Sequence, residues 1–292
     1  MIQHETVEAN GLRFHCARVG EGPLMLFLHG FPEYWAMWRP MLEHFGARGW
    51  CAVAPDLRGY NLSEKPGAVE AYRAKHLMAD VLALAAHYTK DKFVLVAHDW
   101  GGAVAWGVAI AHAQRLSRLV MVNSPHPYLF WRELCNNPAQ QKASEYMRFF
   151  RLPKAERVLS EDGYARLLGA FSDLDEGARQ ELVQAWSQPG ALTGGLNYYR
   201  ASPMVPPSAE DPGAKKLQLD AKDFVVRVPT LVIWGERDTA LLPGCIEGLD
   251  AVVPDLKLVR VPDATHWIAR ERTDLVIREI EAFTIGAGEA SR

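Results

Sequence analysis

Short apolar runs alternate along this chain with longer stretches of helical character. The runs span residues 24–28, 51–54, 93–97, 119–122, 230–234 and 256–259. Because they are almost continuously apolar, they are typical of central strands that are buried on both faces. Residues 72–87 carry apolar side chains at helical spacing, and residues 102–112 are rich in Ala and Val, so both segments predict connecting helices. The pattern indicates an α/β fold with a mostly parallel central sheet flanked by helices.

The alternation stops in the middle of the chain. Aromatic-rich helical stretches at 145–150, 164–171 and 180–186 follow one another without good strands between them. A loop-like, proline-rich stretch over 202–208 then precedes the return of strand signals at Val225. The pattern predicts a helical domain over residues 127–217, inserted into a core domain formed by residues 1–126 and 218–292. The small, polar tail over 286–292 predicts a frayed end.

Composition excludes several functional classes. With 292 residues, 49% hydrophobic and 23% charged, the chain resembles an ordinary globular protein. A formal net charge of -3 cannot supply the broad basic face that binds nucleic acid. The cysteines (Cys16, Cys51, Cys135 and Cys245) lie far apart, so we expect reduced, buried thiols. The histidines lack metal-ligand spacing and no nucleotide-binding loop is present, so we expect no metal and no organic cofactor.

The N-terminal residues lack a basic region followed by an apolar segment, and no apolar stretch approaches the roughly 18 residues of a spanning helix. We therefore expect a cytoplasmic protein that does not enter a membrane. Its oligomeric state is left open, with a homodimer among the possibilities.

Asp99 follows the apolar run 93–97 and is followed by Trp100 and two glycines that open a helix. A residue at such a sharp strand-to-helix turn is held above the sheet as a nucleophile. The usual pattern has Ser at this position and Gly two residues earlier, whereas this chain has Asp99 and Ala97. A carboxylate can displace a leaving group from saturated carbon and form an ester, so the pattern favours alkyl electrophiles as substrates. The alternative is that Asp99 merely caps the helix.

Two neighbouring segments favour the catalytic interpretation. After the run 24–28, the backbone N–H of Phe31 can join that of Trp100 to form an oxyanion hole. After the last run, His266 can reach back over the carboxyl edge of the sheet and activate water. Asp238, which follows the preceding strand, would orient the imidazole. Glu236 and Asp263 are rival acids beside the expected loop position.

These residues, in the chain order Asp, Asp, His, resemble those of α/β-hydrolase-fold enzymes of the epoxide hydrolase and haloalkane dehalogenase group. Residues 56–63, Asp-Leu-Arg-Gly-Tyr-Asn-Leu-Ser, are similar to a segment common in that group. The resemblance covers nearly the whole chain. It implies that residues 127–217 form a helical cap domain and that the Phe31-Pro32 bond is cis.

The leaving group separates the branches of this group. The resemblance to soluble epoxide hydrolases implies that Tyr146 and Tyr199 of the cap grip the epoxide oxygen, although Tyr198 stands beside Tyr199 and leaves that choice open by one position. Phe31 is typical of epoxide hydrolases, whereas haloalkane dehalogenases carry Asn or Glu there. Trp100 stands where fluoroacetate dehalogenases have Arg, which disfavours a haloacid.

The leading hypothesis is an epoxide hydrolase that takes a small-molecule epoxide and water and releases a vicinal diol. We expect substrate contacts from Phe31, Trp100, Phe149, Phe150 and Trp267. The alternatives are a haloalkane or haloacid dehalogenase with the same Asp-His-Asp core, and a ligand-binding protein on a hydrolase fold. The role in the cell, whether detoxification, catabolism or signalling, is left open.

Overall fold

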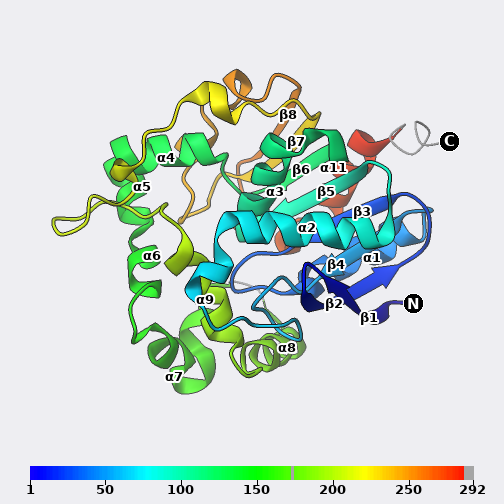
Figure 1. Cartoon of the computed structure of the whole chain (residues 1–292), viewed down its shortest axis with the longest axis horizontal. Helices are drawn as coiled ribbons and strands as arrows, with labels where there is room; N and C mark the ends of the chain where they lie inside the picture. Colours follow the sequence, from blue (N-terminus) through cyan, green and yellow to red (C-terminus); the bar gives the residue numbers. More distant parts are fainter. Residues whose placement is uncertain (172–173, 286–292) are drawn as a thin grey trace.

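The computed structural model describes residues 1–171 and 174–285, so the predicted frayed tail lies outside the described residues. Its strands form one eight-stranded sheet in the order β1-β2-β4-β3-β5-β6-β7-β8 (Figure 1). The strands are β1 (Gln3–Ala9), β2 (Leu12–Val19), β3 (Leu24–Leu28), β4 (Cys51–Pro55), β5 (Phe93–His98), β6 (Leu116–Val122), β7 (Thr230–Gly235) and β8 (Leu256–Val261). Strands β3 to β8 are parallel to their neighbours, and the hairpin β1–β2 pairs antiparallel with β4. The mostly parallel sheet is confirmed.

All six apolar runs are strands, but the sequence pattern missed the hairpin at the edge of the sheet. In β1 only Val7 and Ala9 are buried, so the strand does not read as an apolar run. Its turn, Asn10-Gly11, has positive φ at both residues. Asn-Gly is the pair that a tight hairpin turn favours, and this signal would have revealed the hairpin.

Helices cover both faces of the sheet. Those that flank it are α1 (Arg39–Gly46), α2 (Ala74–Tyr88), α3 (Asp99–Ala111), α10 (Ile268–Glu271) and α11 (Thr273–Thr284). The helices α2 and α3 pack against each other in front of the sheet in Figure 1, and α1 and α11 pack against each other behind it. The helices predicted at 72–87 and 102–112 are therefore confirmed as α2 and α3.

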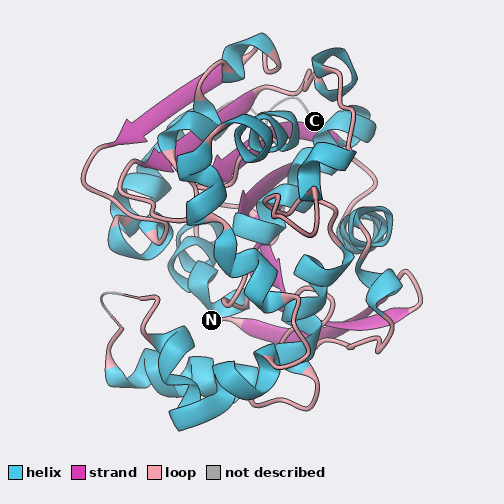
Figure 2. Ribbon diagram, turned by 90° about the vertical axis from the view of Figure 1, so that its left-hand side faces the viewer, coloured by secondary structure: helices cyan, strands magenta, loops and turns pink. Residues whose placement is uncertain are grey.

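Between β6 and β7 the chain forms a run of helices, with no strand in the described parts of residues 127–217. The helices are α4 (Pro127–Asn136), α5 (Pro138–Ala143), α6 (Glu145–Phe150), α7 (Ala155–Leu168), α8 (Glu176–Trp186) and α9 (Ala191–Ala201). In Figure 2, where the left-hand side of Figure 1 faces the viewer, helices lie in front of the strands.

Two predicted boundaries are wrong. The stretch 164–171 is not one helix, because the backbone leaves the helical region from Glu161 to Tyr164 and α7 ends at Leu168. Asp162 and Gly163, which tolerate positive φ, lie at this break. The strand expected from Val225 begins only at Thr230, after Pro229, which has no N–H to donate to a ladder.

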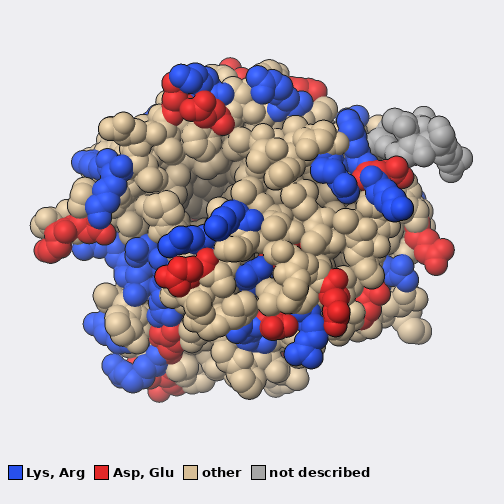
Figure 3. All heavy atoms as spheres, in the orientation of Figure 1, with Lys and Arg blue, Asp and Glu red and all other residues tan. Residues whose placement is uncertain are grey.

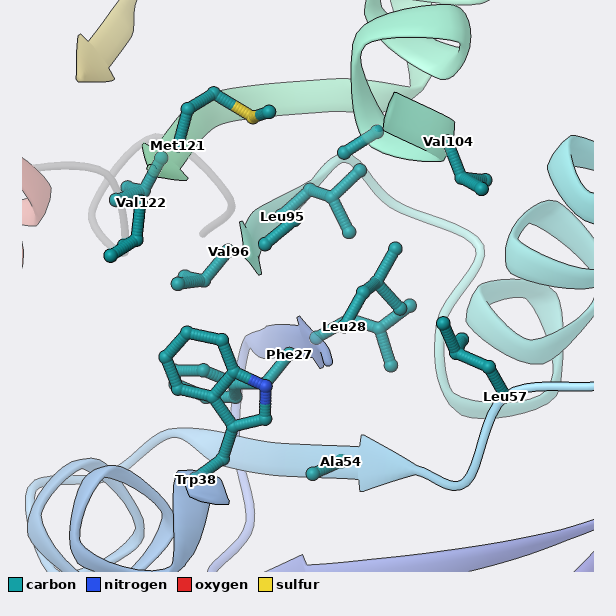
Figure 4. Close-up of a cluster of buried hydrophobic side chains, with 14 of the residues drawn as sticks. Phe27, Leu28, Trp38, Ala54, Leu57, Leu95, Val96, Val104, Met121 and Val122 are labelled. Carbon is teal, nitrogen blue, oxygen red and sulfur yellow. The ribbon is translucent and has the colours of Figure 1, made fainter. Parts of the chain in front are cut away.

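The core is built from the central strands and holds their carboxyl ends in place. Every residue of β3, β4, β5 and β7 is buried. Figure 4 shows side chains from neighbouring strands, Phe27, Leu95 and Met121 among them, together with Trp38 from the segment after β3. Because these interiors are close-packed, the loops that leave the strands at one edge start from a rigid frame.

The surface and the thiols add little chemistry. On the face seen in Figure 3, acidic and basic side chains are interspersed, and a hollow opens in its left half. Cys16, Cys51 and Cys245 are buried free thiols as predicted, whereas Cys135 is only half-buried. Burial raises the pKa of Cys16 to about 12.

In the described part of the chain, no helix has the length and apolar character needed to cross a membrane.

The close contact of α3 with β3 gives a test of the packing. A Cβ atom at Gly101 would lie 2.4 Å from the backbone oxygen of His29 and 2.5 Å from that of Leu28. We expect Gly101→Ala to lower the free energy of unfolding by about 1–3 kcal/mol, as overpacking does. Urea denaturation measures the change. Gly67→Ala is the matched control, because a Cβ there meets nothing within 4 Å; equal stability of the two variants would contradict the packing account.

Candidate active site

Asp99 lies at the turn between β5 and α3, with its backbone at φ +48°. This strained conformation lifts the carboxylate out of the end of the sheet. Gly30 makes room for it, because a Cβ at that position would lie 2.2 Å from Asp99 Oδ1. The Ser124 hydroxyl donates to the backbone oxygen of Asp99 at 2.8 Å and steadies the turn. Asp99 is the first residue of α3, whose N-cap is His98, and its carboxylate lies between the loop after β3 and the loop that carries His266.

Both predicted oxyanion donors meet this carboxylate. The backbone N–H of Phe31 donates to Asp99 Oδ1 at 2.7 Å, and the backbone N–H of Trp100 acts on the carboxylate in the direction that lowers the pKa of Asp99. The Phe31-Pro32 peptide bond is cis, as the resemblance implied. One carboxylate oxygen is thus held by the main chain of the loop after β3.

His266 approaches the other oxygen. Its Nε2 lies 3.7 Å from Asp99 Oδ2, and its Nδ1–H donates to Asp238 Oδ2 at 2.6 Å. The rival acids lie elsewhere: Glu236 pairs with Arg260, and the exposed Asp263 pairs with Arg272. The structure thus brings Asp99, His266 and Asp238 together from the ends of β5, β8 and β7.

Asp238 is anchored by more bonds than the sequence suggested. Its Oδ1 accepts the backbone N–H groups of Ala240 at 2.8 Å and Leu241 at 2.9 Å, and its Oδ2 also accepts the amide N–H of Asn123 at 2.9 Å. Burial acts to raise the pKa of Asp238, but His266 and these donors outweigh burial and hold the pKa below its usual value. Asp238 therefore stays ionised opposite the imidazole.

Sequence reasoning missed Asn123. It stands at the end of β6 with φ +37°, and its Oδ1 accepts the backbone N–H of Gly235 at 2.7 Å. It also missed His98, which is fully buried and donates from Nε2 to the backbone oxygen of His266 at 3.0 Å. Burial and the neighbouring His266 lower the pKa of His98 well below its ordinary value. His98 ends β5 and Asn123 directly follows β6, so their position at the carboxyl end of a strand could have identified both residues.

The charges of the site depend on one another. Burial raises the pKa of Asp99, while His266 and the N–H groups of Phe31 and Trp100 oppose that rise. Burial acts to lower the pKa of His266, but Asp238, Asp99 and Glu33 outweigh burial and raise the pKa to about 9. With Asp99 ionised, the imidazole is therefore protonated at neutral pH. The side chains of Asp99 and His266 remain 12% and 13% exposed, so neither is completely sealed from solvent.

The tyrosines of α6 and α9 separate into two environments. The ring of Tyr199 lies 5.6 Å from that of Phe31, 5.0 Å from that of Trp100 and 6.1 Å from that of Tyr146, measured between centroids. Burial and the charge of Asp99 raise the pKa of both Tyr146 and Tyr199, so both hydroxyls stay protonated. Tyr198 is fully buried, and its hydroxyl donates to the backbone oxygen of Arg58 at 3.0 Å. Of the adjacent pair, Tyr199 has the environment expected of a substrate donor.

The remaining aromatic residues that we expected near a substrate differ in position. The ring of Phe150 lies 5.3 Å from that of Phe31 and 4.9 Å from that of Tyr199, and Phe149 packs against Phe150. Trp267 is tied to the inserted helices: its indole N–H donates to the backbone oxygen of Ala170 at 2.6 Å. Phe150 therefore packs between Phe31 and Tyr199, whereas the indole N–H of Trp267 joins two parts of the fold.

The role of Asn123 can be tested directly. Asn123→Ala removes one donor to Asp238 and leaves buried groups of Gly235 unpaired, so we expect a loss of about 1–3 kcal/mol in the free energy of unfolding. We also expect a lower pKa for His266, because its partner is no longer fixed. Urea denaturation and NMR titration measure the two effects. Asn136→Ala, which removes only an exposed bond to the backbone of Arg132, is the control. An unchanged His266 pKa in Asn123→Ala would refute the view that Asn123 fixes Asp238 opposite the imidazole.

Comparisons with known proteins agree with this geometry. The family model described as alpha/beta hydrolase fold matches residues 23–273. The chain is 33% identical over 292 residues to epoxide hydrolase 4 of Mus musculus, covering 95% of this chain and 77% of that protein. It is 34% identical over 290 residues to epoxide hydrolase 3 of Xenopus tropicalis, covering 94% and 75%.

Solved structures give the same result. The crystal structure of a Bacillus megaterium epoxide hydrolase in complex with an inhibitor superimposes with a TM-score of 0.88 at 31% identity, covering 96% of this chain and 99% of that one. A structure of novel epoxide hydrolases from metagenomes of hot environments gives 0.87 at 36% identity, covering 98% and 99%. The chain therefore belongs to the α/β-hydrolase-fold family and, within it, to the group that contains these epoxide hydrolases.

Proposed function

We propose that the chain hydrolyses an epoxide to a vicinal diol through a hydroxyalkyl ester on Asp99, with water as the second substrate. The observation that carries the proposal is that the two carboxylate oxygens of Asp99 have different partners. One of its oxygens is held by the N–H of Phe31, and the other faces His266 Nε2 at 3.7 Å. Such a carboxylate can attack with one oxygen and support negative charge on the other.

In the first step, Asp99 Oδ2 attacks a carbon of the epoxide ring and the C–O bond at that carbon breaks. The departing electron pair goes to the epoxide oxygen, which takes up a proton from a tyrosine hydroxyl. Tyr146 and Tyr199 are the proposed donors, and their raised pKa keeps them protonated until an alkoxide develops.

In the second step, His266 takes a proton from water, and the resulting hydroxide attacks the carbonyl carbon of the ester. The negative charge then develops on Oδ1, where the N–H of Phe31 stabilises it, and the N–H of Trp100 is the second proposed donor. Collapse of this intermediate frees the diol, which receives its proton from His266. The new carboxyl group of Asp99 then loses its proton to His266, and the tyrosinate left by the first step takes up the proton that His266 gives up before it acts as a base. Asp238 holds the imidazole in the tautomer that leaves Nε2 free for this exchange.

Formation of the ester prepares His266 for its task. Asp99 is one of the charges that raise the pKa of His266. Once Asp99 is esterified, that negative charge is gone and the pKa of His266 falls, which favours the neutral imidazole. The base is thus released by the first step and becomes available for the second.

The division of the chain also belongs to this proposal. Residues 127–217 form the cap, which contributes Tyr146 and Tyr199, and residues 1–126 and 218–292 form the core, which contributes the Asp-His-Asp residues. Phe31, Trp100, Phe149 and Phe150 would line the substrate, with Trp267 beside His266. No specific observation favours the dehalogenase alternative, since the side chain of Phe31 offers a halide no donor. The cytoplasmic location and the homodimer stay predictions.

Mass spectrometry of the intact protein tests the reaction. In His266→Gln the second step is blocked, so we expect an aryl or alkyl epoxide to leave an adduct equal to its full mass. The adduct should be absent from the Asp99→Ala/His266→Gln double variant. A haloalkane and haloacetate run in parallel test the alternative: an adduct only from a halide, short by the mass of the hydrogen halide, would replace this proposal with a dehalogenase. The absence of any adduct would favour a binding protein.

The two adjacent tyrosines give a matched pair of variants. Tyr199→Phe removes a proposed proton donor, and we expect it to slow ester formation by about 10²-fold or more. Tyr198→Phe removes the hydrogen bond to Arg58, so we expect unchanged ester formation and a loss of about 1–3 kcal/mol in unfolding free energy. Stopped-flow tryptophan fluorescence and urea denaturation measure the effects. The reverse pattern would assign the donor to Tyr198.

A further inference from the structure

An ion pair with a fully buried carboxylate joins the loop after β3 to α10, the helix that follows His266. Glu33 follows Phe31 and Pro32 in the loop after β3 and is fully buried. Arg270 lies in α10, one turn after His266. Its Nη2 donates to Glu33 Oε2 at 2.8 Å, and its Nε donates to Oε1. The guanidinium fork therefore binds both carboxylate oxygens at once.

Stability alone is a poor explanation for such a pair. Removing a carboxylate and a guanidinium from water costs free energy that their attraction often does not recover, and an apolar pair of similar volume can be as stable. A bidentate contact does, however, fix the relative position of its two elements. Here these elements are the loop of the oxyanion donor and the segment that follows the base.

We propose that Glu33 and Arg270 are positioning residues for the hydrolytic step: their bidentate contact sets Phe31 and His266 relative to each other, and Arg270 balances the charge of Glu33. The inference rests on the proposed function. It assigns to the pair a role separate from that of Asp238, which holds the imidazole itself.

The charges that surround His266 define what this balance does. The groups that act on His266 are Asp238 after β7, Asp99 after β5, Glu33 after β3 and the neutral His98 of β5. Arg270 in turn faces Glu33, Tyr34 and Glu181. Without Arg270, the charge of Glu33 would stand alone beside the imidazole and favour its protonated form. Without Glu33, the positive charge of Arg270 would disfavour that form.

The inference gives opposite predictions for the two partners. The rate of ester hydrolysis should fall at low pH as His266 becomes protonated, and this fall is the acid limb of the pH–rate profile. In Arg270→Gln, we expect the acid limb to move up by about one pH unit, because the unbalanced charge of Glu33 favours protonation of His266. In Glu33→Gln, we expect the limb to move down by a similar amount. The double variant Glu33→Gln/Arg270→Gln carries neither charge and should return the limb close to that of the parent.

Single-turnover decay of the ester, followed from pH 5 to pH 10 by quenching and intact-protein mass spectrometry, measures these shifts. Arg270→Lys keeps the charge but loses the fork, so we expect an unmoved limb with a lower plateau rate. Arg48→Gln is the matched control: Arg48 pairs with Glu281 of α11, and the two side chains are 51% and 43% exposed, so solvent screens them.

Shifts in the same direction, absent shifts, or a double variant that fails to restore the limb would overturn the inference. If a single variant does not fold, the double variant and Arg270→Lys still test it, because one retains no charge and the other retains both. If the parent forms no ester with any epoxide, the proposed function fails. NMR titration of His266 in the same variants then tests the charge balance by itself.

Discussion

The rest of this structure depends on one constraint: the carboxylate of Asp99 must stay ionised although it lies away from bulk water. Asp99 is largely buried, and burial alone disfavours its charge. The N–H groups of Phe31 and Trp100 and the imidazole of His266 oppose that cost, although burial still leaves the pKa of Asp99 raised. Each donor belongs to a different loop, so the site exists only when three strand ends are brought to one place. The buried parallel strands supply that requirement.

Much of this arrangement follows from the sequence, and the reason is geometric. In parallel sheets, strand ends meet at one edge, so Asp99, Asp238 and His266 could be predicted from the apolar runs that precede them. Asn123 could not, because its bond to Asp238 depends on the register of β6 against β7, which pairs Val122 with Ile233. The hairpin of the edge strand β1 and its neighbour β2 was missed because neither strand is a continuous apolar run in the sequence.

The choice between Tyr198 and Tyr199 shows a second limit. Adjacent residues on a helix point in directions about 100° apart, so the sequence cannot say which one faces the site until the rotation of α9 is known. That rotation is set by a close backbone contact: a Cβ at Gly194 would lie 2.2 Å from the backbone oxygen of Gly59. With this contact in place, the Tyr198 hydroxyl lies at the backbone oxygen of Arg58 and the ring of Tyr199 packs against Phe31, while both rings contact Trp100. A family resemblance could name both segments but could not supply this rotation.

The main-chain bond that holds Oδ1 has a consequence for the atoms of the nucleophile. In the proposed reaction, the ester oxygen leaves with the diol, and the oxygen of water takes its place on the carboxylate. In this reaction Oδ1 would keep the bond that it accepts from the N–H of Phe31. Asp99 would then keep one permanent oxygen and renew the other in every cycle. The oxygen that a diol gains would therefore come from the water molecule consumed in the preceding turnover and not from the water consumed in its own.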